Sequence, residues 1–415
     1  MSRRAHLDTA GYRRALAVPA FRRLVAGNVV SSLGDSMSLV ALLWLAVESS
    51  SGAGRALAVG AVAVAYYAPG VVVGLTAGAA AGRFAPRTLM AADSGLRAAT
   101  LGGVALLALA DEPPLWAIVA LLGVASLLRP LGEAAERTIT ADLVREEERL
   151  AGNSLLFGQA QVAMIVGPAL AGVLVERVSV ALVVGLDAAS FLVLLAVVLS
   201  LPATGARVED VERPRFGLGA VRRFPEVRLL LVVTFCFYAL YGPVEVALPI
   251  HVAGHLDSGP ATLGAMWTAF GLASVVGTAL GGALRGDARV AVVAAVVAGW
   301  GLAVAGIAVA ASPAPAVAAM AIGGLIYGPY QALVTTEVQR RAAGPALTPV
   351  FATWHSVLML ALPLGVVVGG PLVGLLGSQG ALLFSAAGTV ALAAVVPFAG
   401  RGVASRVRPG AGEVV

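Results

Sequence analysis

The sequence predicts an all-α integral membrane protein in which twelve transmembrane helices form two six-helix bundles. Three observations predict this fold class. Hydrophobic residues make up 59% of the 415 residues and charged residues only 12%, and the mean hydropathy is +0.91. A water-soluble fold of this length could not cover its surface with so few polar side chains. Twelve apolar segments follow one another along the chain, and features of the first half recur in the second.

The first half contains six apolar segments, each long enough to cross a hydrocarbon core of about 30 Å. They span residues 24–48, 57–81, 88–110, 115–139, 151–175 and 178–201. The first segment is not expected to be a cleaved signal peptide, because it has full spanning length, lacks a small-residue cleavage site and contains Asn28, Asp35 and Trp44.

The second half repeats this number of apolar segments after a polar, arginine-rich stretch. They span residues 229–251, 261–284, 288–311, 314–340, 347–376 and 380–400. Turn-forming residues at 312–315 and 377–380 mark two of the junctions. The predicted organisation is a cytoplasmic segment, a first bundle, a cytoplasmic linker, a second bundle and a cytoplasmic tail, at residues 1–23, 24–201, 202–228, 229–400 and 401–415.

The arginines predict the orientation of the spans. All 28 basic residues are Arg, and loops rich in Arg or Lys remain on the cytoplasmic side of a membrane. With the N-terminus inside, only Arg55 and Arg177 fall outside, and Arg97 and Arg129 lie within spans, so the other 24 of the 28 are cytoplasmic. Both termini are therefore predicted to be cytoplasmic.

An internal repeat relates the two halves. At an offset of 203 residues, Gly74 and Gly78 align with Gly277 and Gly281. Further coincidences occur at nearly the same offset: Gly167-Pro168 aligns with Gly370-Pro371, and the pair Glu133 and Arg137 aligns with Glu337 and Arg341. Because each half starts on the cytoplasmic side, the repeat is parallel and predicts two bundles that rock about a midplane site.

Several motifs carry a resemblance to a known family. They are Gly27-Asn28, Leu33-Gly34-Asp35 and Trp44-Leu45 in span 1, Gly78-x3-Gly82-Arg83-Phe84-x-Pro86-Arg87 between spans 2 and 3, Asp93-x3-Arg97 in span 3, and Asn153-Ser154 and Gly167-Pro168-x3-Gly172 around span 5. Through them the chain resembles the major facilitator superfamily, and within it the twelve-span drug:proton antiporters that include macrolide efflux proteins and siderophore exporters. This resemblance implies proton-coupled export of lipophilic or amphiphilic molecules by alternating access.

Acidic residues inside spans are candidates for proton coupling, because an intramembrane charge is costly unless it is paired or hydrated. The candidates are Asp35, Glu133, Glu136 and Glu245. Asp35 lies about halfway along span 1, where it could take up and release a proton or could bond to neighbouring helices. Glu245 follows Gly242-Pro243, a predicted helix break in span 7.

Other charged residues within the spans are predicted to form ion pairs. At a spacing of four residues, Asp93 with Arg97 and Glu133 with Arg137 can pair along a helix. The same spacing predicts a pair of Glu337 and Arg341 in the second half. The gate and ion-pair candidates are Asp93, Arg97, Arg129, Arg137, Glu337 and Arg341. Asp187 in span 6 is interpreted as a structural acid.

Small residues and a basic loop are expected to serve the conformational change. The loop between spans 2 and 3 contributes Gly78, Gly82, Arg83 and Arg87. Gly82 stands where the family usually carries an Asp. Bending of spans 5 and 11 is assigned to Gly167, Pro168, Gly172, Gly370 and Pro371.

Substrate contacts are expected from amide, aromatic and imidazole side chains within the spans, since pockets for lipophilic molecules combine apolar walls with a few polar groups. The candidates are Asn28, Trp44, Tyr66, Gln159, Tyr238, Tyr327, Tyr330, Gln331, Trp354 and His355.

The remaining composition limits other functions. No phosphate-binding glycine motif occurs, so energy is expected from a gradient, with the proton as coupling ion. With a single cysteine, Cys236, and four scattered histidines, the sequence predicts no metal and no cofactor. It contains no basic patch interleaved with aromatic residues, so no nucleic-acid partner is expected. The sequence contains no cluster of a nucleophile with a general base, so it does not predict an enzyme. The expected partners are the bilayer and a small molecule, and the chain is expected to be monomeric. A nutrient importer or facilitator and a non-transporting membrane interaction protein remain the alternatives.

Overall fold

A computed structural model describes residues 9–76, 83–110, 114–202, 221–281, 289–342 and 347–406, and within these ranges every regular element is a helix. The chain divides into two compact units. Unit 1 comprises Met1–Ser49 and Ala65–Val211, and unit 2 comprises Ser50–Val64 and Glu212–Val415. Helix α3, Ala53–Thr76, is therefore shared, because its first half groups with unit 2 and its second half with unit 1.

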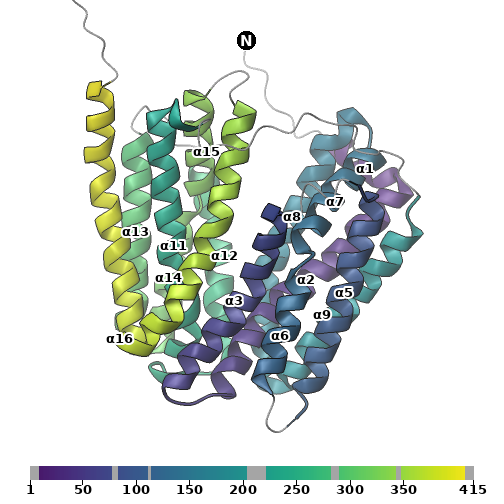
Figure 1. Ribbon diagram of the computed structural model, residues 1–415, viewed down its shortest axis with the longest axis horizontal. Helices are drawn as coiled ribbons and strands as arrows, with labels where there is room; N and C mark the ends of the chain where they lie inside the picture. The colour runs from purple at the N-terminus through teal and green to yellow at the C-terminus, as the bar shows by residue number, and fades with distance from the viewer. Residues whose placement is uncertain are drawn as a thin grey trace, which may run out of the picture. The chain divides into compact units, whose positions relative to one another are not determined.

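Unit 1 is built of long helices (Figure 1). After the short α1 (Thr9–Ala17) they are α2 (Pro19–Glu48), the second half of α3, α5 (Pro86–Leu107), α6 (Leu115–Ser126), α7 (Arg129–Leu143), α8 (Arg149–Arg177) and α9 (Val180–Ser200), with a single 3-10 turn η1 (Glu146–Glu148) before α8. Several begin with a proline in the first turn, where the missing N–H would have no helical partner. The hydroxyl of Ser179 caps α9 by accepting from the backbone N–H of Leu182 at 3.1 Å.

Helix α9 packs against both α2 and α5 in unit 1. Glycines allow these contacts to be close: a Cβ placed on Gly34 of α2 would lie 2.5 Å from Oδ1 of Asp187 on α9. On α7, a Cβ on Gly132 would lie 2.7 Å from the carboxyl carbon of Asp93 on α5. The backbones of neighbouring helices thus touch the acidic side chains directly, as is typical of small residues at membrane helix interfaces.

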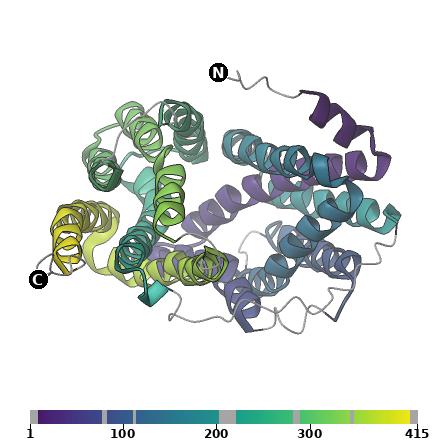
Figure 2. The ribbon, with the colours of Figure 1, turned by 90° about the horizontal axis from the view of Figure 1, so that it is seen from above.

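Unit 2 contains the remaining helices (Figure 2). They are α11 (Pro225–Gly254), α12 (Pro260–Gly281), α13 (Arg289–Val309), α14 (Pro313–Tyr327), α15 (Tyr330–Arg341) and α16 (Leu347–Arg406). Helix α16 is interrupted at Gly377, whose φ of 71° lies in the left-handed region that favours glycine. This break falls at the start of the predicted 377–380 junction. Helix α11 packs against α16, and α12 packs against α14.

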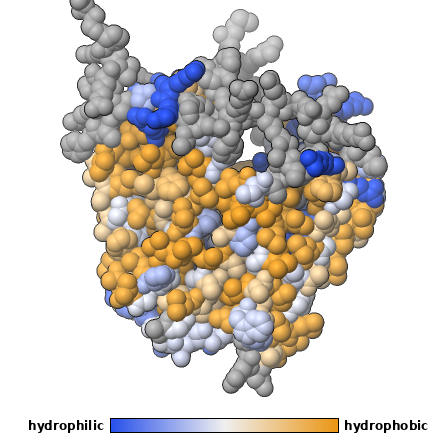
Figure 3. Space-filling view, in the orientation of Figure 1, coloured by the Kyte–Doolittle hydropathy of each residue, from blue (hydrophilic) through white to orange (hydrophobic). Residues whose placement is uncertain are grey.

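Among the described residues, ten helical segments are long and apolar enough to cross a membrane. Two of them join consecutive α-helices, at Leu115–Leu143 and Pro313–Arg341, and a third, Glu146–Arg177, joins η1 to α8. Another, Thr353–Val396, includes the break in α16. Many large apolar side chains on these helices are exposed, among them Trp116 at 79% and Leu375 at 82%. Figure 3 shows hydrophobic residues covering most of the visible helix sides, with strongly hydrophilic residues near the helix ends. The chain is a multi-pass membrane protein.

Candidate functional site

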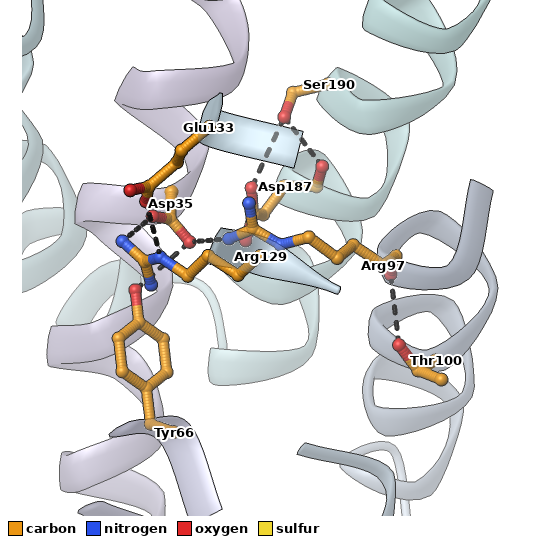
Figure 4. Close-up of polar contacts among 8 residues, drawn as sticks. All are labelled: Asp35, Tyr66, Arg97, Thr100, Arg129, Glu133, Asp187 and Ser190. Carbon is orange, nitrogen blue, oxygen red and sulfur yellow. Dashed lines mark hydrogen bonds and ion pairs between the residues drawn. The ribbon is translucent and has the colours of Figure 1, made fainter. Parts of the chain in front are cut away.

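Asp35 is the centre of a cluster of polar and ionisable side chains in unit 1, which we call the Asp35 cluster: Asp35, Tyr66, Arg97, Arg129, Glu133 and Asp187 (Figure 4). Arg97 donates to Oδ1 of Asp35, and Arg129 lies 3.1 Å from Oδ2. The hydroxyl of Tyr66 donates to Oδ1 at 3.0 Å. One carboxylate therefore links α3, α5 and α7 to α2.

The two guanidinium groups have further partners. Arg129 is 3.1 Å from Oε1 of Glu133 on its own helix, and it lies over the ring of Tyr66 at 5.1 Å from the ring centroid. Arg97 lies 4.0 Å from the centroid of the Phe191 ring on α9. Cations above aromatic faces are stabilised by the ring quadrupole. Each guanidinium thus combines a carboxylate with an aromatic face.

Most of the cluster is shielded from solvent, whereas the Glu133 side chain is 55% exposed. Side-chain exposure is 18% for Asp35, 11% for Arg97 and 31% for Arg129. At this depth each charged group is stabilised by its partner, and removal of one member of a pair leaves the other charge uncompensated. A change in the charge of Asp35 would therefore alter the contacts of three other helices at once.

A small pocket adjoins Asp35. It is lined by Asp35, Tyr66, Arg97, Leu101, Leu122, Ala125, Ser126, Arg129 and Asp187. The space open to the centre of a water molecule is about 20 Å³, and a site needs roughly 10–15 Å³ by this measure to hold one water. The pocket therefore has room for a water between charged groups, and it is far too small for a drug-sized molecule.

The pairing differs from the spacing-based expectations in unit 1. Arg97, the expected partner of Asp93, donates instead to Asp35, and Glu133 bonds to Arg129 at 3.1 Å rather than to Arg137. Oδ1 of the buried Asp93 has no hydrogen-bond partner in the described part of the chain. Arg137 is exposed.

The other predicted residues of this half have separate environments. The side-chain amide of the buried Asn28 donates to Oε1 of Glu136 at 2.9 Å. This hydrogen bond connects a predicted substrate-binding residue to a predicted proton-coupling residue. The indole N–H of Trp44 donates to Glu48 at 2.7 Å, and both residues lie at the C-terminal end of α2. Oε1 of Gln159 is buried without a hydrogen-bond partner among the described residues.

The loop and bending candidates are only partly described. Gly78 and Gly82 lie outside the described residues, Arg83 is exposed, and Arg87 donates to the carbonyl oxygen of Leu199. The bending candidates of α8 are buried, and a Cβ on Gly167 would lie 2.5 Å from the Cβ of Ser36 on α2. Among the bending candidates, buried Gly167, Pro168, Gly172 and Gly370 contrast with exposed Pro371. Gly167 therefore serves a close helix contact.

The expected ion pair of the second half is present. Arg341 donates to Glu337 on the same helix and also to Glu226 at the start of α11. Arg340 lies 3.2 Å from the other carboxylate oxygen of Glu337. The side chain of Glu337 is 1% exposed, whereas that of Arg340 is 48% exposed.

Replacing Arg341 by Gln is expected to destabilise the protein by on the order of 3 kcal/mol, because the buried Glu337 loses its main cation. Arg340→Gln is the matched control: its exposed ion pair is worth at most about 1 kcal/mol. The thermal unfolding of both variants in detergent measures the difference. Equal midpoints for the two variants would contradict this interpretation.

Aromatic side chains form a continuous cluster in unit 2, which we call the aromatic cluster. Its members come from α11 to α15: Phe237, Tyr238, Tyr241, Trp267, Phe270, Trp300, Tyr327 and Tyr330. The rings of Tyr327 and Tyr330 stack at 5.9 Å, and the hydroxyls of Tyr238 and Tyr327 are 3.3 Å apart. The Gln331 amide donates to the Tyr238 hydroxyl.

The predicted substrate residues thus separate into two groups in unit 2. Tyr238, Tyr327, Tyr330 and Gln331 come together, and Tyr330 is fully buried with its hydroxyl donating to Thr234 at 3.0 Å. Trp354 is buried, and the exposed His355 stacks on Phe351 at 6.1 Å.

The predicted Glu245 contacts the aromatic cluster through Tyr241, and three members of the cluster, Phe237, Phe270 and Trp300, are not among the predicted residues. Glu245 is 3% exposed and accepts from the Tyr241 hydroxyl at 2.9 Å. Phe237, Phe270 and Trp300 carry no polar pattern that would single them out in a sequence of this hydropathy. Their only signal was aromatic character within apolar segments.

Comparison with known proteins identifies similar transporters. The family model described as the Major Facilitator Superfamily matches residues 24–344. The chain is 29% identical over 378 residues to the multidrug efflux pump Tap of Mycobacterium tuberculosis. The matched region covers 85% of this chain and 87% of that relative. It is 22% identical over 390 residues to macrolide efflux protein A of Streptococcus pyogenes, which covers 91% of this chain and 95% of that protein.

A solved structure gives the corresponding likeness in three dimensions. The crystal structure of the nucleoside transporter NupG matches with a TM-score of 0.69 and 15% identity, over 92% of this chain and 99% of that one. At this identity the likeness concerns the fold alone.

Proposed function

The chain belongs to the Major Facilitator Superfamily, and we propose that it is a secondary transporter that exports lipophilic or amphiphilic small molecules in exchange for protons. The chain's similarity to multidrug and macrolide efflux proteins over most of its length supports export as the direction and such molecules as the substrate class. Because one chain holds both halves of the repeat, the proposal includes a monomeric transporter.

The proposed topology has twelve spans and cytoplasmic termini. Helix α5, Pro86–Leu107, is not among the ten apolar segments, yet its 22 residues are long enough to span, and its charges Asp93 and Arg97 lie in its middle. The break at Gly377 divides α16 into two further spans. Both features support two bundles at 24–201 and 229–400, and the distribution of arginines supports the orientation.

The observation that carries the proposal is the position of Asp35 between two arginines. In its charged form the carboxylate holds Arg97 and Arg129. Protonation removes its charge, and both arginines then lose their common partner. A proton taken up from the outside and released to the cytoplasm would in this way switch the contacts of α2 with α5 and α7 once per cycle. A transporter needs such a bistable element to couple a proton to a conformational change.

The aromatic cluster is the proposed contact surface for the substrate. Its members Phe237, Trp300 and Tyr330 are buried and support the half-buried Tyr238 and Tyr327. Aromatic faces bind lipophilic molecules through large contact areas, and the hydroxyl and amide groups of Tyr238 and Gln331 add a few polar contacts.

Tyr327→Ala is expected to weaken substrate binding about tenfold, since loss of aromatic contacts worth roughly 1.4 kcal/mol corresponds to that factor. Binding of a fluorescent substrate to the purified protein in detergent measures the affinity. Trp116→Ala is the control, because Trp116 is 79% exposed on α6. An unchanged affinity in Tyr327→Ala would remove the aromatic cluster from the substrate site.

Cells that lack their own efflux pumps provide the test of direction and coupling. With the protein expressed, we expect lower accumulation of some macrolides, dyes or siderophores, and a protonophore should abolish the difference. Accumulation raised above the empty-vector level would favour an importer. No change for any compound, with normal amounts of protein in the membrane, would favour a non-transporting function.

A further inference from the structure

Asp187 is a fully buried carboxyl group close to Asp35. It lies on α9 at 0% exposure and packs against the backbone of Gly34, where there is no room for a Cβ. Asp35 and Asp187 both line the small pocket, and Figure 4 draws their side chains. Two acids from different helices thus line one small pocket.

The contacts of Asp187 do not suit a charged carboxylate. The Ser190 hydroxyl donates to the backbone oxygen of Asp187 at 2.7 Å, and its distance to Oδ1 is longer, at 3.3 Å. Oδ2 has no hydrogen-bond partner within the described parts of the chain. The nearby cations are committed elsewhere, since Arg97 and Arg129 both hold Asp35. A buried charge with one long hydrogen bond and no ion pair among the described residues is strongly unfavourable, so the neutral, protonated acid fits these surroundings.

The groups that face Asp187 come from the helices packed against α9. They are Asp35 from α2 and Arg97 from α5, with Arg129 of α7 across the pocket. The pocket has room for one water, which needs two or more polar partners. A water there can accept a proton from one carboxyl group while it donates another to the second.

We propose that Asp187 is a second proton-binding residue that works in exchange with Asp35. When Asp35 is charged and holds the arginines, Asp187 carries the proton. The O–H bond at Asp187 then breaks as the proton passes through the water to Asp35, and a new O–H bond forms there. Arg97, released by neutral Asp35, turns to the carboxylate of Asp187. The total charge of the Asp35 cluster is unchanged by this transfer, so no additional net charge has to be buried.

The inference rests on the proposed proton-coupled export and adds a residue to it. Asp187→Asn has the shape of the neutral acid, so we expect it to fold and to retain substrate exchange across proteoliposomes without a pH gradient. Gradient-driven export should fall at least about tenfold, and its pH profile should lose one titration step. The infrared spectrum of the wild type should contain a protonated carboxyl band that is absent from Asp187→Asn. Glu176→Gln, an exposed change on α8, is the control for all three measurements.

The outcomes separate this inference from the proposed function. An uncoupled wild type would contradict the proposed function itself. A coupled wild type, together with an Asp187→Asn variant whose export, pH profile and carboxyl band are unchanged, would overturn the inference alone. Failure of Asp187→Asn to fold would also overturn it, because the amide replaces the neutral acid in size and polarity.

Discussion

Asp35→Asn is expected to reduce gradient-driven export by about 100-fold or more, the range that accompanies the loss of a group that transfers protons. The amide cannot bind or release the proton, and it no longer neutralises Arg97 and Arg129. Exchange of labelled for unlabelled substrate across proteoliposomes needs no net proton movement, so it should continue. The two assays on one preparation measure coupling and conformational cycling separately.

A fold defect must be distinguished from a coupling defect in this variant. Removing one member of a buried pair costs roughly 3–5 kcal/mol, so Asp35→Asn should also unfold at a lower temperature. Asp187 can take up Arg97 in this variant, so the double variant Asp35→Asn with Arg129→Gln, which removes the cation left with only the exposed Glu133, should regain part of the stability without regaining coupled export. Export restored in the double variant, or undiminished in Asp35→Asn, would show that Asp35 does not carry the proton.

Gly365→Ala is expected to destabilise the second unit by on the order of 3 kcal/mol, near the upper end of the cost of overpacking. A Cβ at this position would overlap the carbonyl oxygen of Ala239 on α11 and lie 3.0 Å from the Cα of Gly242. Both are backbone atoms of a helix, so α11 and α16 must separate to accept the methyl group. Thermal unfolding in detergent, followed by tryptophan fluorescence, measures the loss.

Gly374→Ala on the same helix provides the matched comparison. Nothing lies within 4 Å of a Cβ at Gly374, and alanine favours a helix over glycine by up to about 1 kcal/mol. This variant should be as stable as the wild type or more so. If Gly365→Ala unfolds at the same temperature as Gly374→Ala, the contact between α11 and α16 must be looser than described.

Local spacing predicted some contacts because both partners lie on one helix. Glu337 and Arg341 pair as their i, i+4 positions suggested. Glu133 has cations four residues away on either side, and spacing alone cannot choose between them. The structure places Arg129 next to Asp35 of another helix, and Glu133 joins that group.

Tertiary contacts were beyond the reach of sequence spacing. Arg97 was expected to neutralise Asp93, yet the packing of α5 and α9 against their neighbours brings it to Asp35. Tyr66 is predicted to contact the substrate, and the structure adds that its hydroxyl donates to the same carboxylate. The intramembrane charges signalled that partners must exist. Which helix supplied each partner depended on how the helices pack.

The pattern of apolar segments, by contrast, predicted the helical architecture well. Apolar segments of spanning length indicate helices because only a helix satisfies its backbone hydrogen bonds in hydrocarbon without help from neighbours. The turn signal at 377–380 coincides with the non-helical Gly377 in α16. In the aromatic cluster, Tyr238, Tyr327 and Gln331 were chosen for polar groups in apolar spans, and they do lie together.

Simultaneous measurement of substrate and proton flux in proteoliposomes is the decisive test of proton-coupled export. The purified wild type is reconstituted, a pH gradient is imposed, and an internal pH dye and a labelled substrate identified in the cellular assay are followed together. We expect substrate to move against its own gradient while protons move the opposite way, and Asp35→Asn to show neither movement. Substrate flux that is independent of the pH gradient and accompanied by no proton movement would contradict it.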